Sequence, residues 1–143
     1  MIRLTRRYSF SASHRLHSAS LDEETNRQVY GKCNNPYGHG HNYTVEISVQ
    51  GPIDAQTGLA VNLQSLDAFV GDSVLKTLDH RNLNAEVEEF RHLVPTTENL
   101  AIVIEQRLRA RWPESFPPLE KIRIAETERN IFEVHGKLEN KSR

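Results

Sequence analysis

Four segments of the chain alternate between apolar and polar residues, which is the pattern of half-buried β-strands. The first, Ile2–Leu16, has apolar side chains at most even-numbered positions, and the second, His41–Gln50, ends at Gly51-Pro52. The last two segments, 120–127 and 130–138, are close enough along the chain to form a hairpin. The sequence therefore predicts two strands towards each end of the chain.

Two helical patterns lie between these strand pairs. Asn62 is suited to cap the first helix, whose apolar residues recur every three or four positions at Leu63, Leu66, Phe69, Val70 and Val74. Thr96 or Thr97 is suited to cap the second helix, which ends before Pro113 and carries an apolar stripe of Leu100, Ile104 and Leu108. We expect the polar stretch 22–26 and the Gly-, Asn- and Pro-rich stretch 31–38 to be loops.

The resulting order, ββααββ, predicts an α+β fold in which two helices cover one face of a four-stranded antiparallel sheet. We expect residues 1–143 to form a single domain, with a frayed tail after Leu138. So small a sheet has two open edges, and open strand edges must be paired or blunted. The pattern therefore predicts edge-to-edge self-assembly of identical chains.

Composition narrows the functional classes. Eighteen basic and 19 acidic side chains nearly cancel, so we expect neither nucleic acid nor an anionic membrane as a partner. We find no apolar run of membrane-spanning length and expect no signal peptide at the first residues. A single cysteine allows no intrachain disulfide and suits a reducing cytoplasm.

Three of the seven histidines stand where they can share a ligand. His39 and His41 flank Gly40 at the start of the second strand, and alternate residues of an extended chain point to one side. His14 lies at the end of the first strand, on its apolar side. Surface or core histidines are the plainer interpretation of each one alone. Together they resemble a three-histidine zinc site with an open fourth position.

Cys33, six residues before His39, leaves three interpretations open. It is a small buried apolar residue, a fourth zinc ligand, or a thiolate base whose pKa a nearby cation lowers. Asp79-His80 is either an ordinary helix end or a proton relay. Glu126 lies on the apolar side of its strand, where a carboxylate either pairs with an arginine or accepts two N–H bonds from a planar guanidine-like ring edge.

Five ordered motifs resemble the 6-pyruvoyl-tetrahydropterin synthase family over nearly the whole chain. They are Tyr8-Ser-Phe-Ser-Ala-Ser-His-Arg-Leu16, Gly31-Lys-Cys-Asn-Asn-Pro-Tyr-Gly-His-Gly-His-Asn-Tyr43, Leu78-Asp-His-Arg-Asn-Leu83, Thr96-Thr-Glu-Asn99 and Glu126-Thr127. The resemblance implies the tunnelling fold, or T-fold, in which three subunits join their sheets into a barrel and two trimers stack as a hexamer.

The resemblance also implies roles for individual residues. Zinc would be held by His14, His39 and His41, and Cys33 would be the proton-abstracting base. Asp79, His80 and Glu126 would be its relay partners, and Glu126 would anchor the pterin with help from Thr96, Thr97 and Glu98. The implied reaction converts 7,8-dihydroneopterin triphosphate to 6-pyruvoyl-tetrahydropterin and triphosphate, at sites formed between subunits.

Two alternatives stay open. The related 6-carboxy-tetrahydropterin synthases use the same substrate, but their cysteine usually lies closer to the His-Gly-His motif than Cys33 does here. A non-catalytic, zinc-stabilised module that binds a pterin or purine is the second alternative.

Overall fold

A single sheet organises the computed structural model, which describes residues 1–135. The strand order is β3-β1-β2-β4-β5, and the four longer strands pair with one another in antiparallel orientation. These strands are β1 (Ile2–His14), β2 (His39–Gly51), β4 (Leu119–Ala125) and β5 (Ile131–His135). The predicted alternating segments are therefore confirmed as strands. Residues 136–138 of the last predicted strand, and the tail after Leu138, lie outside the described residues.

The prediction of four strands was one short. A fifth strand, β3 (Arg81–Asn82), runs parallel to β1 and pairs with it at Ala12 and Ser13. Two residues are too few to show an alternating pattern, so the sequence carried no signal for β3. β3 covers only the C-terminal end of the outer edge of β1.

The pairing of β1 with β2 fixes the geometry of one end of the sheet. Thirteen residue pairs run without interruption from Ile2 opposite Gly51 to His14 opposite His39. Because side chains alternate along both strands, this register places the even residues of β1 and the odd residues of β2 on the same face. His14, His39 and His41 consequently emerge on one side of the sheet.

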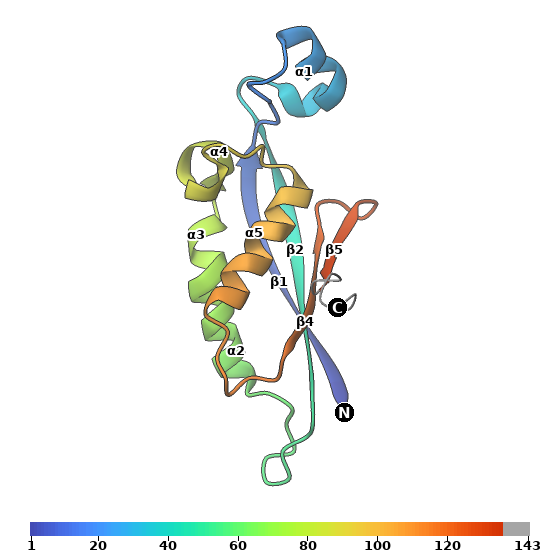
Figure 1. Cartoon of the computed structure of the whole chain (residues 1–143), viewed down its shortest axis with the longest axis vertical. Coiled ribbons are helices and arrows are strands. Elements are labelled where there is room, and N and C mark those ends of the chain that lie inside the picture. The colour runs from blue at the N-terminus through green and yellow to red at the C-terminus, as the bar shows by residue number, and fades with distance from the viewer. Residues whose placement is uncertain (136–143) are drawn as a thin grey trace, which may run out of the picture.

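The helices between β2 and β4 lie on that same side, whereas the helix between β1 and β2 lies beyond the end of the sheet (Figure 1). Asn62 caps α2 (Leu63–Val70) and Thr96 caps α5 (Thr97–Ala110), as the sequence predicts. A π-helical turn (Gly71–Leu75) carries α2 into α3 (Lys76–Leu78). α4 (Leu83–Glu86) and a 3₁₀ turn (Glu88–Phe90) then lead towards α5.

The prediction of a loop at 22–26 was wrong. This stretch begins α1 (Glu23–Tyr30). Asp22 caps the N-terminus of this helix, and its side chain accepts a hydrogen bond from the Thr25 amide. No apolar stripe marks the helix, because its one fully buried side chain is the polar Asn26. The Asn26 amide satisfies main-chain groups of Ser18, Leu21 and Asp22. A 3₁₀ turn, Gly31–Asn34, follows α1 within the second predicted loop.

The core fills the space between the sheet and the helices. Its largest fully buried apolar side chains are Tyr43, Ile47, Leu66, Leu78, Leu83, Leu100, Ile104, Leu108, Ile122 and Ile124. The stripes predicted for both helices therefore face the strands, and their burial supplies the main stabilisation of the fold.

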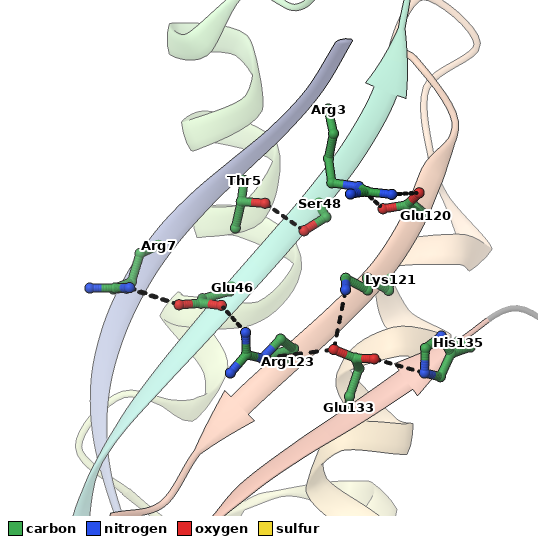
Figure 2. Close-up of polar contacts among 10 residues, drawn as sticks. All are labelled: Arg3, Thr5, Arg7, Glu46, Ser48, Glu120, Lys121, Arg123, Glu133 and His135. Atoms are coloured by element: carbon green, nitrogen blue, oxygen red, sulfur yellow. Dashed lines mark hydrogen bonds and ion pairs between the residues drawn. The ribbon is translucent and has the colours of Figure 1, made fainter. Parts of the chain in front are cut away.

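The opposite face of the sheet is polar. A row of alternating charge crosses all four long strands at one register level, from Arg7 through Glu46 and Arg123 to Glu133 (Figure 2). Arg7 lies 2.9 Å from Glu46, which is 3.6 Å from Arg123, and Arg123 is 3.8 Å from Glu133. Facing unlike charges suits a face that stays in contact with water.

None of the helices in the described part of the chain is long and apolar enough to cross a membrane.

Two isoleucines of α5 provide a test of this packing. Ile104 is fully buried whereas Ile102 is 44% exposed. We expect Ile104→Ala to lower the free energy of unfolding by about 2–5 kcal/mol, because it removes buried methyl groups and leaves a cavity. Ile102→Ala, the same change on the exposed side, should alter it by at most about 0.5 kcal/mol. Urea unfolding measures both, and equal losses would contradict the assigned helix face.

Candidate metal centre and active site

Three histidine rings converge where β1 ends and β2 begins. The ring centroids of His14 lie 5.0 Å from those of both His39 and His41. The Nε2 atoms of His39 and His41 are 2.9 Å apart. The predicted cluster is therefore assembled within one chain by the β1–β2 register.

His14 is held in one tautomer. It is fully buried, and its Nδ1 lies 2.9 Å from the carbonyl oxygen of Pro95, which can only accept a hydrogen bond. Nδ1 therefore carries the proton, and Nε2 presents a lone pair. Burial, reinforced by the neighbouring histidines, lowers the pKa of His14 to about 4, so the ring is neutral at physiological pH.

The His14 Nε2 atom is the clearest indication of a missing ligand. Among the described residues it is the one buried side-chain nitrogen or oxygen without a hydrogen-bond partner. An unsatisfied buried polar atom is costly, and a metal-ligating histidine commonly binds a backbone carbonyl through its other nitrogen. Nitrogens around a tetrahedral zinc ion lie about 3.3 Å apart, close to the His39–His41 separation. These residues fit a metal ion.

Cys33 borders this cluster from the 3₁₀ turn. Its Sγ atom is 3.6 Å from Nε2 of His39, and the donor atoms of His14, Cys33 and His39 all lie within 4.8 Å of one another. Burial, followed by the charge of Glu126, raises the pKa of the Cys33 thiol. A thiolate at neutral pH therefore requires a cation beside it, and both the ligand and the base interpretations remain consistent with this geometry.

A hollow of about 710 Å³ opens over the cluster. It is lined by Lys32, Cys33, Asn35, His39 and His41. The half-buried thiol and two of the three imidazoles are therefore accessible to a small molecule, whereas His14 forms the closed back of the site.

Glu126 borders the cluster on its other side, one residue after β4 ends. Its Oε1 lies 3.3 Å from Nε2 of His41, and its Oε2 accepts a hydrogen bond of 2.7 Å from the Thr97 hydroxyl. No arginine pairs with Glu126 among residues 1–135, which excludes the ion pair for the described part of the chain. Glu126 forms a second potential donor group with His14 and His41.

The other residues of the predicted Thr-Thr-Glu motif behave differently. Thr96 is committed to capping, since its hydroxyl accepts the amide of Asn99. Glu98 is exposed in the first turn of α5. Of the three, only the buried Thr97 reaches the cluster through its side chain.

Asp79 and His80 form a pair at the outer edge of β1, apart from Cys33. Their side chains meet at 3.1 Å, and both residues bind the main chain of Ser11. His80 has a left-handed backbone (φ 60°), a conformation that costs energy and is common at functional positions. His80 lines a second hollow of about 430 Å³ together with Ser11, Asn42, Arg81 and Glu86, and His41 borders both this hollow and the one over the cluster. Within one chain, the predicted relay to Cys33 does not form.

Two contributors were absent from the sequence-based prediction. Tyr43 continues the alternation of His39 and His41, and its buried hydroxyl lies 3.3 Å from Nδ1 of His14. That alternation is a signal that could have identified Tyr43. Pro95 acts through its carbonyl oxygen, which has no sequence signature.

The geometry also explains why residue 38, between Cys33 and His39, is a glycine. Gly38 has φ +73°, and a Cβ there would lie 2.9 Å from the His14 carbonyl oxygen. We expect Gly38→Ala to displace the β1 end and to weaken zinc binding at least tenfold in a chelator competition. Gly58 has the same φ with open space around it. Gly58→Ala should therefore cost stability alone, and equal zinc affinities for the two variants would contradict the close-approach argument.

Comparison with known proteins agrees with this arrangement. The 6-pyruvoyl tetrahydropterin synthase family model matches residues 3–137. A Poecilia reticulata protein named 6-pyruvoyl tetrahydrobiopterin synthase is 50% identical over 133 residues, 93% of this chain and 89% of that protein. A Bacillus subtilis 6-carboxy-5,6,7,8-tetrahydropterin synthase is 32% identical over 105 residues, 72% of this chain and 68% of that protein.

A solved structure extends the match to the fold. The Caenorhabditis elegans 6-pyruvoyl tetrahydropterin synthase matches with a TM-score of 0.86 and 40% identity, covering 95% of this chain and 96% of that one. The predicted α+β T-fold is thereby confirmed, with a fifth short strand added. Sequence and structure together place the chain in the 6-pyruvoyl tetrahydropterin synthase family.

Proposed function

We propose that this chain is a zinc-dependent lyase that converts 7,8-dihydroneopterin triphosphate to 6-pyruvoyl-tetrahydropterin and triphosphate. One observation carries the proposal: the bare Nε2 of His14 lies among His39 and His41, with Cys33 on one side and Glu126 on the other. Potential metal ligands and a thiol thus line one hollow in a member of this family, and a carboxylate lies beside His41.

His14, His39 and His41 would hold the zinc ion, His14 through its Nε2 atom. Bound there, zinc would supply Lewis acidity, which acidifies carbon–hydrogen bonds next to coordinated side-chain hydroxyls. The protein contributes the orientation of the ligands, since the Pro95 carbonyl fixes the His14 tautomer before any ion binds.

Cys33 would act as the base that removes a proton from the substrate side chain. His80, held by Asp79, would return a proton elsewhere on the substrate. The side-chain carbon next to the ring is oxidised from an alcohol to a ketone, and the ring carbon–nitrogen double bond is reduced by the same two electrons. Elimination of triphosphate turns the second alcohol into a ketone and the terminal carbon into a methyl group, with no net redox change. The reaction therefore needs no external oxidant or reductant.

Glu126 would recognise the pterin ring. Its carboxylate suits the paired N–H donors of a guanidine-like ring edge, which two oxygens accept side by side. The hydrogen bond from Thr97 holds Oε2 in place, so the carboxylate meets the ring already oriented. Family resemblance assigns Thr96 and Glu98 to the same subsite. The Thr96 side chain would contribute indirectly, because it caps α5 and so holds the main chain there.

The complete site would form between subunits of a hexamer, a dimer of trimers, in the cytoplasm. β5 presents an open edge among the described residues, and β3 covers only two residues of the opposite edge. The position of Asp79-His80 against Ser11 at the outer edge of β1, outside the hollow that Cys33 lines, supports a shared site, because each chain would offer one half to its neighbour. A monomer in light scattering at micromolar concentration would contradict this assembly.

The second candidate product is 6-carboxy-tetrahydropterin, which the Bacillus subtilis relative keeps open. The longer spacing between Cys33 and His39 favours the pyruvoyl product. A third candidate, a binding module without activity, predicts tight pterin binding and no release of triphosphate.

The decisive experiment incubates the zinc-loaded protein with 7,8-dihydroneopterin triphosphate and measures triphosphate release and product mass. We expect release with a pyruvoyl side chain. Cys33→Ala should retain one zinc per chain yet lose at least about 100-fold in turnover, because it lacks the base. A carboxyl product would support the alternative enzyme, absence of release the binding module, and zinc loss from the variant a ligand role for Cys33.

A shared site predicts complementation between inactive variants. Cys33→Ala and His80→Ala chains should each be inactive alone, because each removes one half of every site. Co-assembled at equal amounts, they should recover about a quarter of wild-type activity, since one site in four then combines an intact Cys33 with an intact His80. Mixed assemblies as inactive as the parents would show that both residues act within one chain.

A further inference from the structure

We propose that Asn34 is the positioning residue that fixes Cys33 relative to the histidine cluster. The inference rests on the proposed role of Cys33 as the base. It concerns how the chain holds that side chain before any substrate binds.

The segment that carries Cys33 has little to hold it in place by itself. It is a four-residue 3₁₀ turn, Gly31–Asn34, and such short turns have few and poorly aligned internal hydrogen bonds. Packing contributes little, since the following residues Asn35, Pro36 and Tyr37 are exposed. The position of the thiol must therefore come from contacts with other elements.

Those contacts are concentrated on the two residues that follow His14. The Leu16 amide donates to the carbonyl oxygen of Cys33 at 2.7 Å. The Asn34 side-chain amide donates to the Leu16 carbonyl oxygen at 2.8 Å, and the Arg15 guanidinium donates to the Asn34 carbonyl oxygen at 3.1 Å. Both main-chain groups of Leu16 are thus hydrogen-bonded to the turn, its amide to Cys33 and its carbonyl oxygen to Asn34.

Asn34 is the one residue of the turn whose side chain takes part in these bonds. It is buried, at 7% exposure, and its amide also lies 3.1 Å from Nδ1 of His17. An asparagine buried on a short polar turn costs desolvation energy unless its amide is bonded, so these bonds define its orientation. Through Asn34, the thiol and the His14 ligand share one rigid frame.

The neighbouring Asn84 offers a matched control. From α4 its side chain binds the same segment, accepting the Arg15 amide at 2.7 Å and donating to the Arg15 carbonyl oxygen at 2.9 Å. It makes two hydrogen bonds to main-chain groups next to Leu16, as close to His14 as those of Asn34. None of its recorded bonds reaches the Cys33 turn.

The test compares Asn34→Ala with Asn84→Ala in the zinc-loaded, full-length protein. For each, the melting temperature, zinc content, kcat, KM and the rate of Cys33 alkylation by iodoacetamide at one fixed pH are measured. We expect both variants to keep their zinc, and Asn34→Ala to lose more thermal stability, because Asn34 is buried whereas Asn84 is exposed. Asn34→Ala should lower kcat by about 10–100-fold at unchanged KM, since small displacements of a catalytic group have effects of this size.

Thiol reactivity separates positioning from stability. Alkylation of Asn34→Ala should be at least fivefold faster than that of wild type, whereas Asn84→Ala should stay within twofold. Asn34→Asp, which keeps the side-chain size but cannot donate to the Leu16 carbonyl as a carboxylate, should follow Asn34→Ala if the alanine variant does not fold.

Two results would overturn the proposal: wild-type alkylation of both Asn34 variants, or an equal increase in Asn84→Ala. Failure of the proposed function appears differently. If Cys33→Ala retained full turnover, Cys33 would not be the base, yet the alkylation rates would still report whether Asn34 positions it.

Discussion

The unbroken antiparallel register between β1 and β2 is the constraint on which the rest of the site depends. Thirteen consecutive residue pairs end with His14 opposite His39, and alternation then brings His41 to the same face. A shift of one residue would turn either His14 or the His39–His41 pair to the polar face, and the three rings could then not converge. The candidate metal centre therefore depends on strand pairing before it depends on any loop.

Around these paired strands, several polar groups of the site have specific hydrogen-bond partners. The Pro95 carbonyl binds Nδ1 of His14, Thr97 binds Glu126, and Asn34 binds the chain that leaves β1. These bonds leave Nε2 of His14 without a hydrogen-bond partner, while Oε1 of Glu126 lies 3.3 Å from His41 and Sγ of Cys33 lies 3.6 Å from His39. The N-terminus of α5 matters here because Thr96 caps it and so delivers Thr97 to the cluster.

The two faces of the sheet differ in what they contact. The apolar face packs against α2, α3 and α5, while the other carries the charge row from Arg7 to Glu133 (Figure 2). Among residues 1–135, no strand pairs with the outer edge of β5, and an unpaired strand edge is a surface suited to pairing with another chain. His80, with its left-handed backbone, is held at the edge of β1 by Ser11.

The sequence by itself determined the elements with regular periodicity and the chemical groups of the site. Alternation identified the four long strands, and the stripes and caps identified α2 and α5. Position along the chain singled out His14, His39, His41, Cys33 and Glu126, and family resemblance then implied their roles. It could not reveal α1, because a helix built around the polar Asn26 has no apolar stripe, nor β3, which is too short for a period. Only tertiary structure decided that Thr97 rather than an arginine binds Glu126, that the Pro95 carbonyl selects the His14 tautomer, and that Asp79-His80 lies apart from Cys33. Those contacts join residues 29 to 81 positions apart or run through main-chain atoms, and neither kind leaves a pattern in the sequence.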